Sequence, residues 1–287
     1  MKPQKVLYLC ACVLIALISC KKDLSTADKN PGNNPPGNVP DSIIETVPAT
    51  HGSLSVDVNA NCAGYYYAVP ERYDSSTQNY PLILFIHGIG ELGNGKSDLV
   101  NMTRAGLPRL INKNGFPPSF ESGGEHFSFI VVAPQFKKWP TNADVNSVLQ
   151  YAIKKYRIDE SRIYMAGLSM GGGVTWNFSA EFGGSLAAVV PICGGSNPDN
   201  KRAASIAAFN LPVWAFHNED DPTVPVSFSR DYVSKINSYH PAVAAKLTTW
   251  KTGGHDSWTK AFDPATKENG MNMYEWMLQY KNLLKKG

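Results

Sequence analysis

The most informative segment of this 287-residue chain is Tyr164-Met165-Ala166-Gly167-Leu168-Ser169-Met170-Gly171-Gly172-Gly173. It begins in an apolar run, Arg162–Ala166, turns sharply at Gly-Leu-Ser-Met-Gly, and continues as a helical pattern over Met170–Phe182. A nucleophile elbow requires this order of strand, turn and helix, because the turn must expose a serine hydroxyl. The first amides of the helix and its positive dipole end also face the serine. We therefore predict that Ser169 is a nucleophile; the alternative is a plain strand-to-helix turn.

Working outward from this segment, the chain alternates short apolar runs with amphipathic helical patterns. Strands are predicted at Leu82–Ile86, Phe129–Ala133, Arg162–Ala166, Ala187–Ile192, Val213–Phe216 and Lys246–Trp250, with an earlier edge strand at Gly64–Val69. Helices are predicted at Val145–Tyr156, Met170–Phe182, Phe228–Tyr239 and Asn272–Leu283. Continuously apolar strands separated by helices indicate an α/β fold, with a mostly parallel central sheet and helices on both faces. Functional residues are then expected at the carboxyl ends of the strands.

A serine hydroxyl needs a base, and the base needs an acid to orient it. In this fold the acid and then the histidine follow the serine along the chain. His255 lies in a glycine-hinged loop after the last predicted strand, and we expect it to be the base. The acid is expected in the loop after Val213–Phe216, where Asp221 precedes a Pro-Thr-Val-Pro turn. Asp220 is the alternative acid.

The transition state of acyl transfer carries an oxyanion, which needs hydrogen-bond donors. One predicted donor is the backbone N–H of Met170, directly after the nucleophile. The second is expected in the glycine-rich loop His87–Gly93, with Ile89 first and Gly90 as its alternative. His87 is expected to order this loop by hydrogen bonding and not to act as a base.

Several stretches together are similar to a known group of proteins. They are His87–Gly95, Ala133-Pro134-Gln135, Tyr164–Gly172, Val190–Gly195, Pro212–His217 and Gly254–Trp258. The chain resembles the α/β-hydrolases of the phospholipase/carboxylesterase-like or "predicted peptidase" group, which is related to feruloyl esterases and polyhydroxybutyrate depolymerases. The resemblance implies a triad of Ser169, Asp221 and His255 that cleaves carboxylic esters through an acyl-enzyme without a cofactor. Asn218 stands where the group usually has glycine, and a small effect is expected because asparagine tolerates positive φ.

The substrate is less well defined than the chemistry, because this fold hosts many functions. Aromatic side chains that either line the pocket or pack in the core are Phe136, Trp139, Trp176 and Trp258. Of these we expect Trp139 and Trp258, together with Gln135, to contact substrate. An exported enzyme with such a rim suggests the removal of feruloyl or acetyl groups from polysaccharides. A serine peptidase with the same triad and a non-catalytic binding lipoprotein are the rival interpretations.

The N-terminus indicates export. Lys2 and Lys5 precede an apolar run, Val6–Ile18, whose length suits a signal peptide better than the roughly 20 residues of a membrane span. The run ends in Leu17-Ile18-Ser19-Cys20, which resembles the lipobox of bacterial lipoproteins and implies lipidation of Cys20. An ordinary secretory signal is the alternative. The predicted organisation is a signal peptide (1–19), the lipidated cysteine with a flexible linker rich in Pro, Asn and Gly (20–50), and a catalytic domain (51–287). The lipid is expected to anchor the protein in a bacterial cell envelope, on the periplasmic or the outer side.

Composition narrows the partners. The chain carries a formal charge of +3, and loss of Lys2 and Lys5 with the signal leaves 25 basic against 24 acidic residues, so nothing favours nucleic acid. No metal-ligand spacing, phosphate loop or dinucleotide fingerprint occurs in a fitting context, so no metal or cofactor is expected. Cys62 and Cys193, the two cysteines of the predicted domain, either pair in an oxidising compartment or remain buried thiols.

Overall fold

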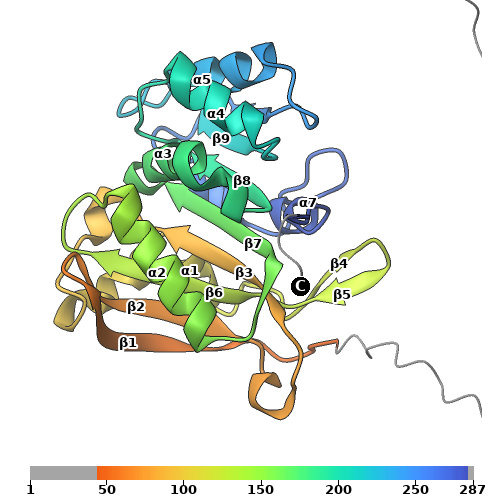
Figure 1. The fold of residues 1–287 in the computed structure, drawn as a ribbon. Helices are drawn as coiled ribbons and strands as arrows, with labels where there is room; N and C mark the ends of the chain where they lie inside the picture. Colours follow the sequence, from red (N-terminus) through yellow and green to blue (C-terminus); the bar gives the residue numbers. More distant parts are fainter. Residues whose placement is uncertain (1–43, 284–287) are drawn as a thin grey trace, which may run out of the picture. The chain divides into compact units, whose positions relative to one another are not determined.

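The computed structural model describes residues 44–283, which form one compact unit (Figure 1). The predicted signal peptide, Cys20 and most of the predicted linker lie outside the described residues. Among the described residues, no helix is long and apolar enough to cross a membrane. The compact unit begins a few residues before the predicted boundary at His51, because Glu45 is buried and pairs with Arg72.

An eight-stranded sheet forms the centre, in the order β1-β2-β6-β3-β7-β8-β9-β10. Its strands are β1 Thr50–Asn59, β2 Cys62–Val69, β3 Tyr80–Ile86, β6 Ile130–Phe136, β7 Ile158–Leu168, β8 Ala188–Ile192, β9 Trp214–Asn218 and β10 Lys246–Trp250. In this order, the six strands β6, β3, β7, β8, β9 and β10 run parallel to one another. The strand β2 pairs antiparallel with both β1 and β6. A separate hairpin joins β4 (Phe120–Ser122) to β5 (Glu125–Phe127). The predicted α/β architecture with a mostly parallel sheet is confirmed.

Helices cover both faces of the sheet. The helices are α1 Gly106–Asn112, α2 Asn142–Lys155, α3 Met170–Phe182, α4 Asn200–Ala208, α5 Ser227–Ser238, α6 Trp258–Phe262 and α7 Met273–Met277, with short 3-10 helices that include η2 Ile89–Glu91 and η3 Ser97–Arg104. One apolar core lies between the sheet and α2 to α5, and a second lies between the sheet and η3, α1, α6 and α7. Figure 1 shows α2 and α3 in front of the strands.

The core strands form because their residues are apolar on both sides. In β3, Leu82 and Leu84 enter one core and Ile83 and Phe85 enter the other, and all four are at most 1% exposed. A strand buried on both faces needs this unbroken apolar run, whereas a half-exposed strand alternates. The residues after these strands therefore reach the carboxyl edge of a rigid sheet, where the site lies.

Two predicted elements differ from the structure. Gly64–Val69 belongs to β2, which is not an edge strand, because β1 pairs along its outer side. The helix predicted at Asn272–Leu283 is wrong in length: α7 ends at Met277. Beyond it Asn282 donates its backbone N–H to Ser161 and its side-chain amide to Gly184, so tertiary hydrogen bonds replace further helical turns.

The two domain cysteines are free thiols and do not pair. Cys62 lies in the core beside α2 to α5, and Cys193 lies in the core on the other face of the sheet. The sheet between them explains why the alternative of a disulfide fails.

Candidate active site

Ser169 stands between β7 and α3 in a strained backbone conformation, with φ 52° and ψ −114°. Its own carbonyl accepts hydrogen bonds from the amides of Gly173 and Gly195, both at 3.0 Å, which hold the turn in place. Glycine is required where α3 crosses the segment after β8, because a Cβ on Gly172 would lie 2.5 Å from the carbonyl oxygen of Ile192. The elbow predicted from the sequence is therefore present, and its strain is held by close backbone packing.

Three side chains from separate loops form one chain of hydrogen bonds. The hydroxyl of Ser169 lies 2.8 Å from Nε2 of His255, and Nδ1 of His255 lies 2.7 Å from Oδ2 of Asp221. With Nδ1 protonated, His255 donates to the carboxylate and presents Nε2 as the acceptor for the serine proton. This arrangement allows proton transfer from Ser169 as its oxygen attacks a carbonyl carbon.

Asp221 is held as a carboxylate. Burial alone would raise its pKa, but hydrogen bonds from His255 and from the amides of Val224 and Thr223 outweigh burial and lower the pKa of Asp221 below its ordinary value. The two amides bind Oδ1 at 3.0 and 2.8 Å, which leaves Oδ2 for the imidazole. The carboxylate is therefore charged and fixed in orientation at neutral pH.

A second histidine contacts the same carboxylate. His217, which is fully buried at the end of β9, places Nε2 at 2.9 Å from the carbonyl oxygen of Val224 and 3.2 Å from Oδ2 of Asp221. Its Nδ1 lies 2.8 Å from the hydroxyl of Ser229 in α5. Burial lowers the pKa of His217, so the ring is neutral, donates from Nε2 and accepts from Ser229. This contact of His217 was not predicted from the sequence.

The loop that carries His255 is tied to the acid loop by two neighbours of Asp221. Asp220, the alternative acid, accepts hydrogen bonds from the amides of Gly253 and Gly254 and does not face the imidazole. Asn218 lies in β9 without positive φ, and its side-chain amide donates to the carbonyl of Gly254 at 3.0 Å. The departure of Asn218 from glycine was visible in the sequence, but its partner was not.

The loop after β3 is ordered from within. The carboxylate of Glu91 accepts from the amide of Gly88 at 3.0 Å. His87 accepts from the amide of Phe136 at Nε2 and donates from Nδ1 to the carbonyl of Gly88, which confirms its predicted ordering role. Burial lowers the pKa of His87 to about 4. The loop is therefore braced by a neutral histidine and a carboxylate, neither of which reaches Ser169.

Ile89 and Met170 are the first residues of η2 and α3, so their amides have no acceptor within their own helices. Both residues line the cavity that contains Ser169, so their amides remain the predicted oxyanion donors. Gln135 does not line this cavity. It is fully buried, and its amide group binds the backbone of Gly95 and of Glu91, so it supports the loop that follows Ile89.

The cavity beside Ser169 has a volume of about 330 Å³ and a largely apolar wall. Trp139, which is 45% exposed, lines it together with Val224, Pro225 and Phe228. The other three aromatic candidates do not line this cavity. Trp176 is buried and stacks on Tyr232, and Phe136 is buried beside His87. Trp258 packs edge-on against the His255 ring, with centroids 5.2 Å apart, and lines a separate cavity with Gly106.

One cluster in the described part of the chain has donors of the kinds that bind metals: Cys193, Asp221 and His255 offer atoms within 4.8 Å of one another. Burial raises the pKa of Cys193 to about 12, so a thiolate is disfavoured there. A metal would also take the imidazole and carboxylate that already bind each other. The donors therefore suit proton transfer better than a resident metal.

Comparisons with known proteins agree with this geometry. The model of the phospholipase/carboxylesterase family matches residues 71–268. A thermostable esterase of known structure is 27% identical, with a TM-score of 0.60, over 81% of this chain and 63% of its own. A bifunctional acetylxylan esterase/xylanase from Neocallimastix patriciarum is 27% identical over 144 residues, which are 50% of this chain and 19% of that protein.

A ferulic acid esterase structure shares the fold at 17% identity, with a TM-score of 0.51, over 74% of this chain and 92% of its own. The chain thus spans less than two thirds of the esterase and about a fifth of the bifunctional enzyme. The family match, by contrast, covers more than half of the present chain and includes all three residues of the hydrogen-bonded chain. The chain therefore belongs to the phospholipase/carboxylesterase family of α/β-hydrolases.

Proposed function

We propose that this protein is a serine carboxylesterase that removes a phenolic acyl group, of the feruloyl kind, from a polysaccharide-linked ester. The observation that carries the proposal is the hydrogen-bonded chain of Ser169, His255 and Asp221 at the wall of an apolar cavity. An acetyl group would leave most of a 330 Å³ cavity unfilled, whereas an aromatic acyl group would pack against Trp139 and Phe228.

In the proposed reaction, Ser169 Oγ attacks the ester carbonyl carbon while His255 accepts the hydroxyl proton. The amides of Met170 and Ile89 donate to the oxyanion that forms. The C–O bond to the alcohol then breaks, and the alcohol leaves with the proton from His255. Water next gives a proton to His255 and attacks the acyl-enzyme, which releases the carboxylic acid and restores Ser169.

The direct test is hydrolysis of methyl ferulate, p-nitrophenyl acetate, butyrate and octanoate, and a short amide by residues 21–287. Ester turnover that Ser169→Ala abolishes is expected. Faster cleavage of the amide than of every ester would favour the serine peptidase. A folded protein that cleaves none of these substrates would contradict the esterase and leave a binding protein.

Removal of acetyl groups is the second candidate, because the relative from Neocallimastix patriciarum includes an acetylxylan esterase. Trp139→Ala separates the two. Loss of an aromatic contact should lower kcat/KM for methyl ferulate about tenfold and leave p-nitrophenyl acetate little changed. Tyr239→Ala, at an exposed aromatic residue at the end of α5, is the matched control. Equal loss on both esters would contradict a contact between Trp139 and an aromatic acyl group.

We also propose export and lipid anchoring at Cys20, on the basis of the resemblance to a lipobox. A single lipid chain binds membranes reversibly, so stable anchoring requires the fuller modification that lipoproteins carry. Cys20→Ser in the full chain should move the protein from the membrane fraction to the soluble fraction. Retention of the variant in the membrane fraction would contradict lipidation at this residue.

A further inference from the structure

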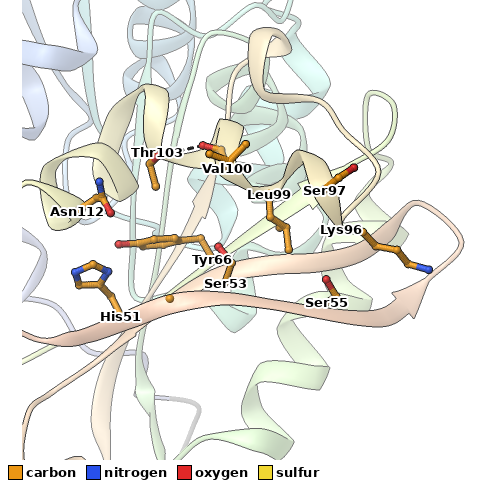
Figure 2. Close-up of a pocket in the computed structure, with 11 residues that line it drawn as sticks. His51, Ser53, Ser55, Tyr66, Lys96, Ser97, Leu99, Val100, Thr103 and Asn112 are labelled. Carbon is orange, nitrogen blue, oxygen red and sulfur yellow. Dashed lines mark hydrogen bonds between the residues drawn. The ribbon is translucent and has the colours of Figure 1, made fainter.

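A second cavity lies along the edge strand β1 and shares no lining residue with the one that contains Ser169. Its volume is about 730 Å³, within the range of ligand sites. One wall is β1 with Tyr66 of β2, and the other is formed by residues of η3 and α1 (Figure 2). The lining residues are His51, Gly52, Ser53, Ser55, Tyr66, Lys96, Ser97, Leu99, Val100, Thr103 and Asn112.

The groove presents hydroxyl and amide groups beside the apolar side chains of Leu99 and Val100. Alternate residues of β1 turn Leu54 and Val56 toward the core, whereas Ser53 and Ser55 are exposed in the groove. Ser97, Thr103 and Asn112 add further polar groups from the opposite wall, and the lining contains no carboxylate. A ligand with many hydroxyl groups suits such a lining better than an apolar one.

Tyr66 provides the independent observation. It is 2% exposed, and its phenolic hydroxyl has no hydrogen-bond partner among the described residues. Figure 2 shows this hydroxyl directed toward His51 and Asn112 at one end of the groove. A buried polar group without a partner costs folding free energy, so it needs an explanation. A ligand oxygen in the groove would satisfy it.

The groove leads toward the catalytic edge of the sheet. Ser55 pairs with Gly64 near the start of β2, and Cys62 pairs with Phe136 at the end of β6, so this part of β1 lies where the parallel strands end. His51 pairs with Ala68, toward the opposite edge. The groove therefore runs along the strands, with Lys96 near the end at which Ser169 also lies.

We propose that this groove binds an oligosaccharide segment of the polymer whose ester groups reach Ser169. The inference rests on the proposed polysaccharide-linked substrate. Tyr66 and Asn112 would bind sugar hydroxyls at one end. Lys96, the cation of the lining at the other end, would favour a chain that carries acidic sugar branches.

Calorimetric titration of the Ser169→Ala protein with xylohexaose, and with the same oligosaccharide carrying a glucuronosyl branch, tests the proposal without turnover. Tyr66→Phe should weaken binding of both about fivefold, and Tyr239→Phe should change neither. Lys96→Gln should weaken the branched ligand alone. Thermal unfolding of the unliganded Tyr66→Phe protein should occur at the same or a higher temperature, because the lost hydroxyl had no partner.

Absence of binding, or equal affinity in the Tyr66→Phe and parent proteins, would overturn the proposal. A lower unfolding temperature for unliganded Tyr66→Phe would also overturn it, because the hydroxyl would then have a partner already. The failure of the proposed esterase is distinguishable from these outcomes. It would appear as absent turnover in the protein with Ser169 intact, whatever the calorimetry gives.

Discussion

Two loops meet beside Ser169, and each begins with a buried histidine at the end of a parallel strand. In the loop after β3, which carries the predicted oxyanion donor Ile89 and is called the oxyanion side below, His87 forms hydrogen bonds with backbone groups, those of Gly88 and Phe136. In the loop after β9, which carries Asp221 and is called the acid side below, His217 binds the carbonyl of Val224 and also the carboxylate of Asp221. One histidine therefore supports the shape of a loop, while the other also stabilises a charge. A buried histidine near an active site is thus no sign of a base by itself.

The largest expected effect belongs to the acid side. Asp221→Asn should lower kcat about ten-thousandfold, because an amide favours the wrong tautomer of His255 and cannot stabilise the imidazolium. Steady-state kinetics on a p-nitrophenyl ester measure the loss. Asp220→Asn is the matched control, and only a small loss is expected because Asp220 binds loop amides. A larger loss from Asp220→Asn would assign the acid to that residue.

On the oxyanion side, the buried His87 should make the free energy of unfolding fall at low pH. The pKa of His87 is lowered to about 4 from 6.5, so the unfolded chain takes up a proton first as pH falls. Stability is then complete above about pH 6.5 and declines toward pH 4, by about 3 kcal/mol in total. Urea unfolding between pH 7 and 4 measures the slope.

His87→Gln should flatten this slope, since glutamine has no proton to gain in that range. His217, whose pKa is also lowered by burial, contributes in the same direction and should leave a residual slope in the variant. An unchanged slope in His87→Gln would assign the acid sensitivity to other groups.

The contact that distinguishes the two histidines gives a smaller effect. His217→Leu should lower kcat about thirtyfold with a smaller change in KM, because Asp221 loses a donor whereas His217 itself does not line the substrate cavity. His217→Gln should recover part of the loss, since its amide can reach Val224 and Asp221. Circular dichroism checks that both variants are folded. Equal kcat in the two folded variants would show that His217 contributes by packing and not by its hydrogen bond to Asp221.

The smallest expected effect lies in the link between the acid loop and the His255 loop. Asn218→Ala should lower kcat about fivefold by removing the hydrogen bond to the carbonyl of Gly254. Asn218→Gly restores the residue that the resembling group usually has, and should show a similar loss, because the rest of this loop is built around asparagine. Activity of the glycine variant at the parent level would contradict that role.

The sequence was sufficient where local pattern and chain order carry the information. The elbow at Ser169 follows from one strand, one turn and one helix, and the order along the chain identified His255 and Asp221, which the structure brings within hydrogen-bond distance. The core strands were found for a similar reason. Short unbroken apolar runs such as Leu82–Ile86, in a chain that alternates them with helical patterns, are typical of strands buried on both faces.

Features that depend on contacts between distant segments were missed. The strand β1 was not predicted. It carries Ser, Gly, His and Asp between its apolar residues, and it directly follows the polar linker, so its alternation of half-buried and exposed residues resembled linker sequence. Gln135 and Trp258 were predicted to contact substrate. In the structure Gln135 binds the backbone of Gly95 and Glu91, and Trp258 packs against His255, and no local sequence pattern indicates these contacts. Nothing in the one-dimensional pattern distinguishes Trp139 from the buried Trp176.

The strained turn at Ser169 sets stability against activity. A non-glycine residue at φ 52° and ψ −114° costs on the order of 1–3 kcal/mol, which the packing of Gly172 against the segment after β8 must offset. Glycine at position 169 would relax the backbone and remove the nucleophile in one step. A glycine at position 169 should therefore give a chain that is more stable and has no turnover, so the stability of the native chain is below what this fold could reach.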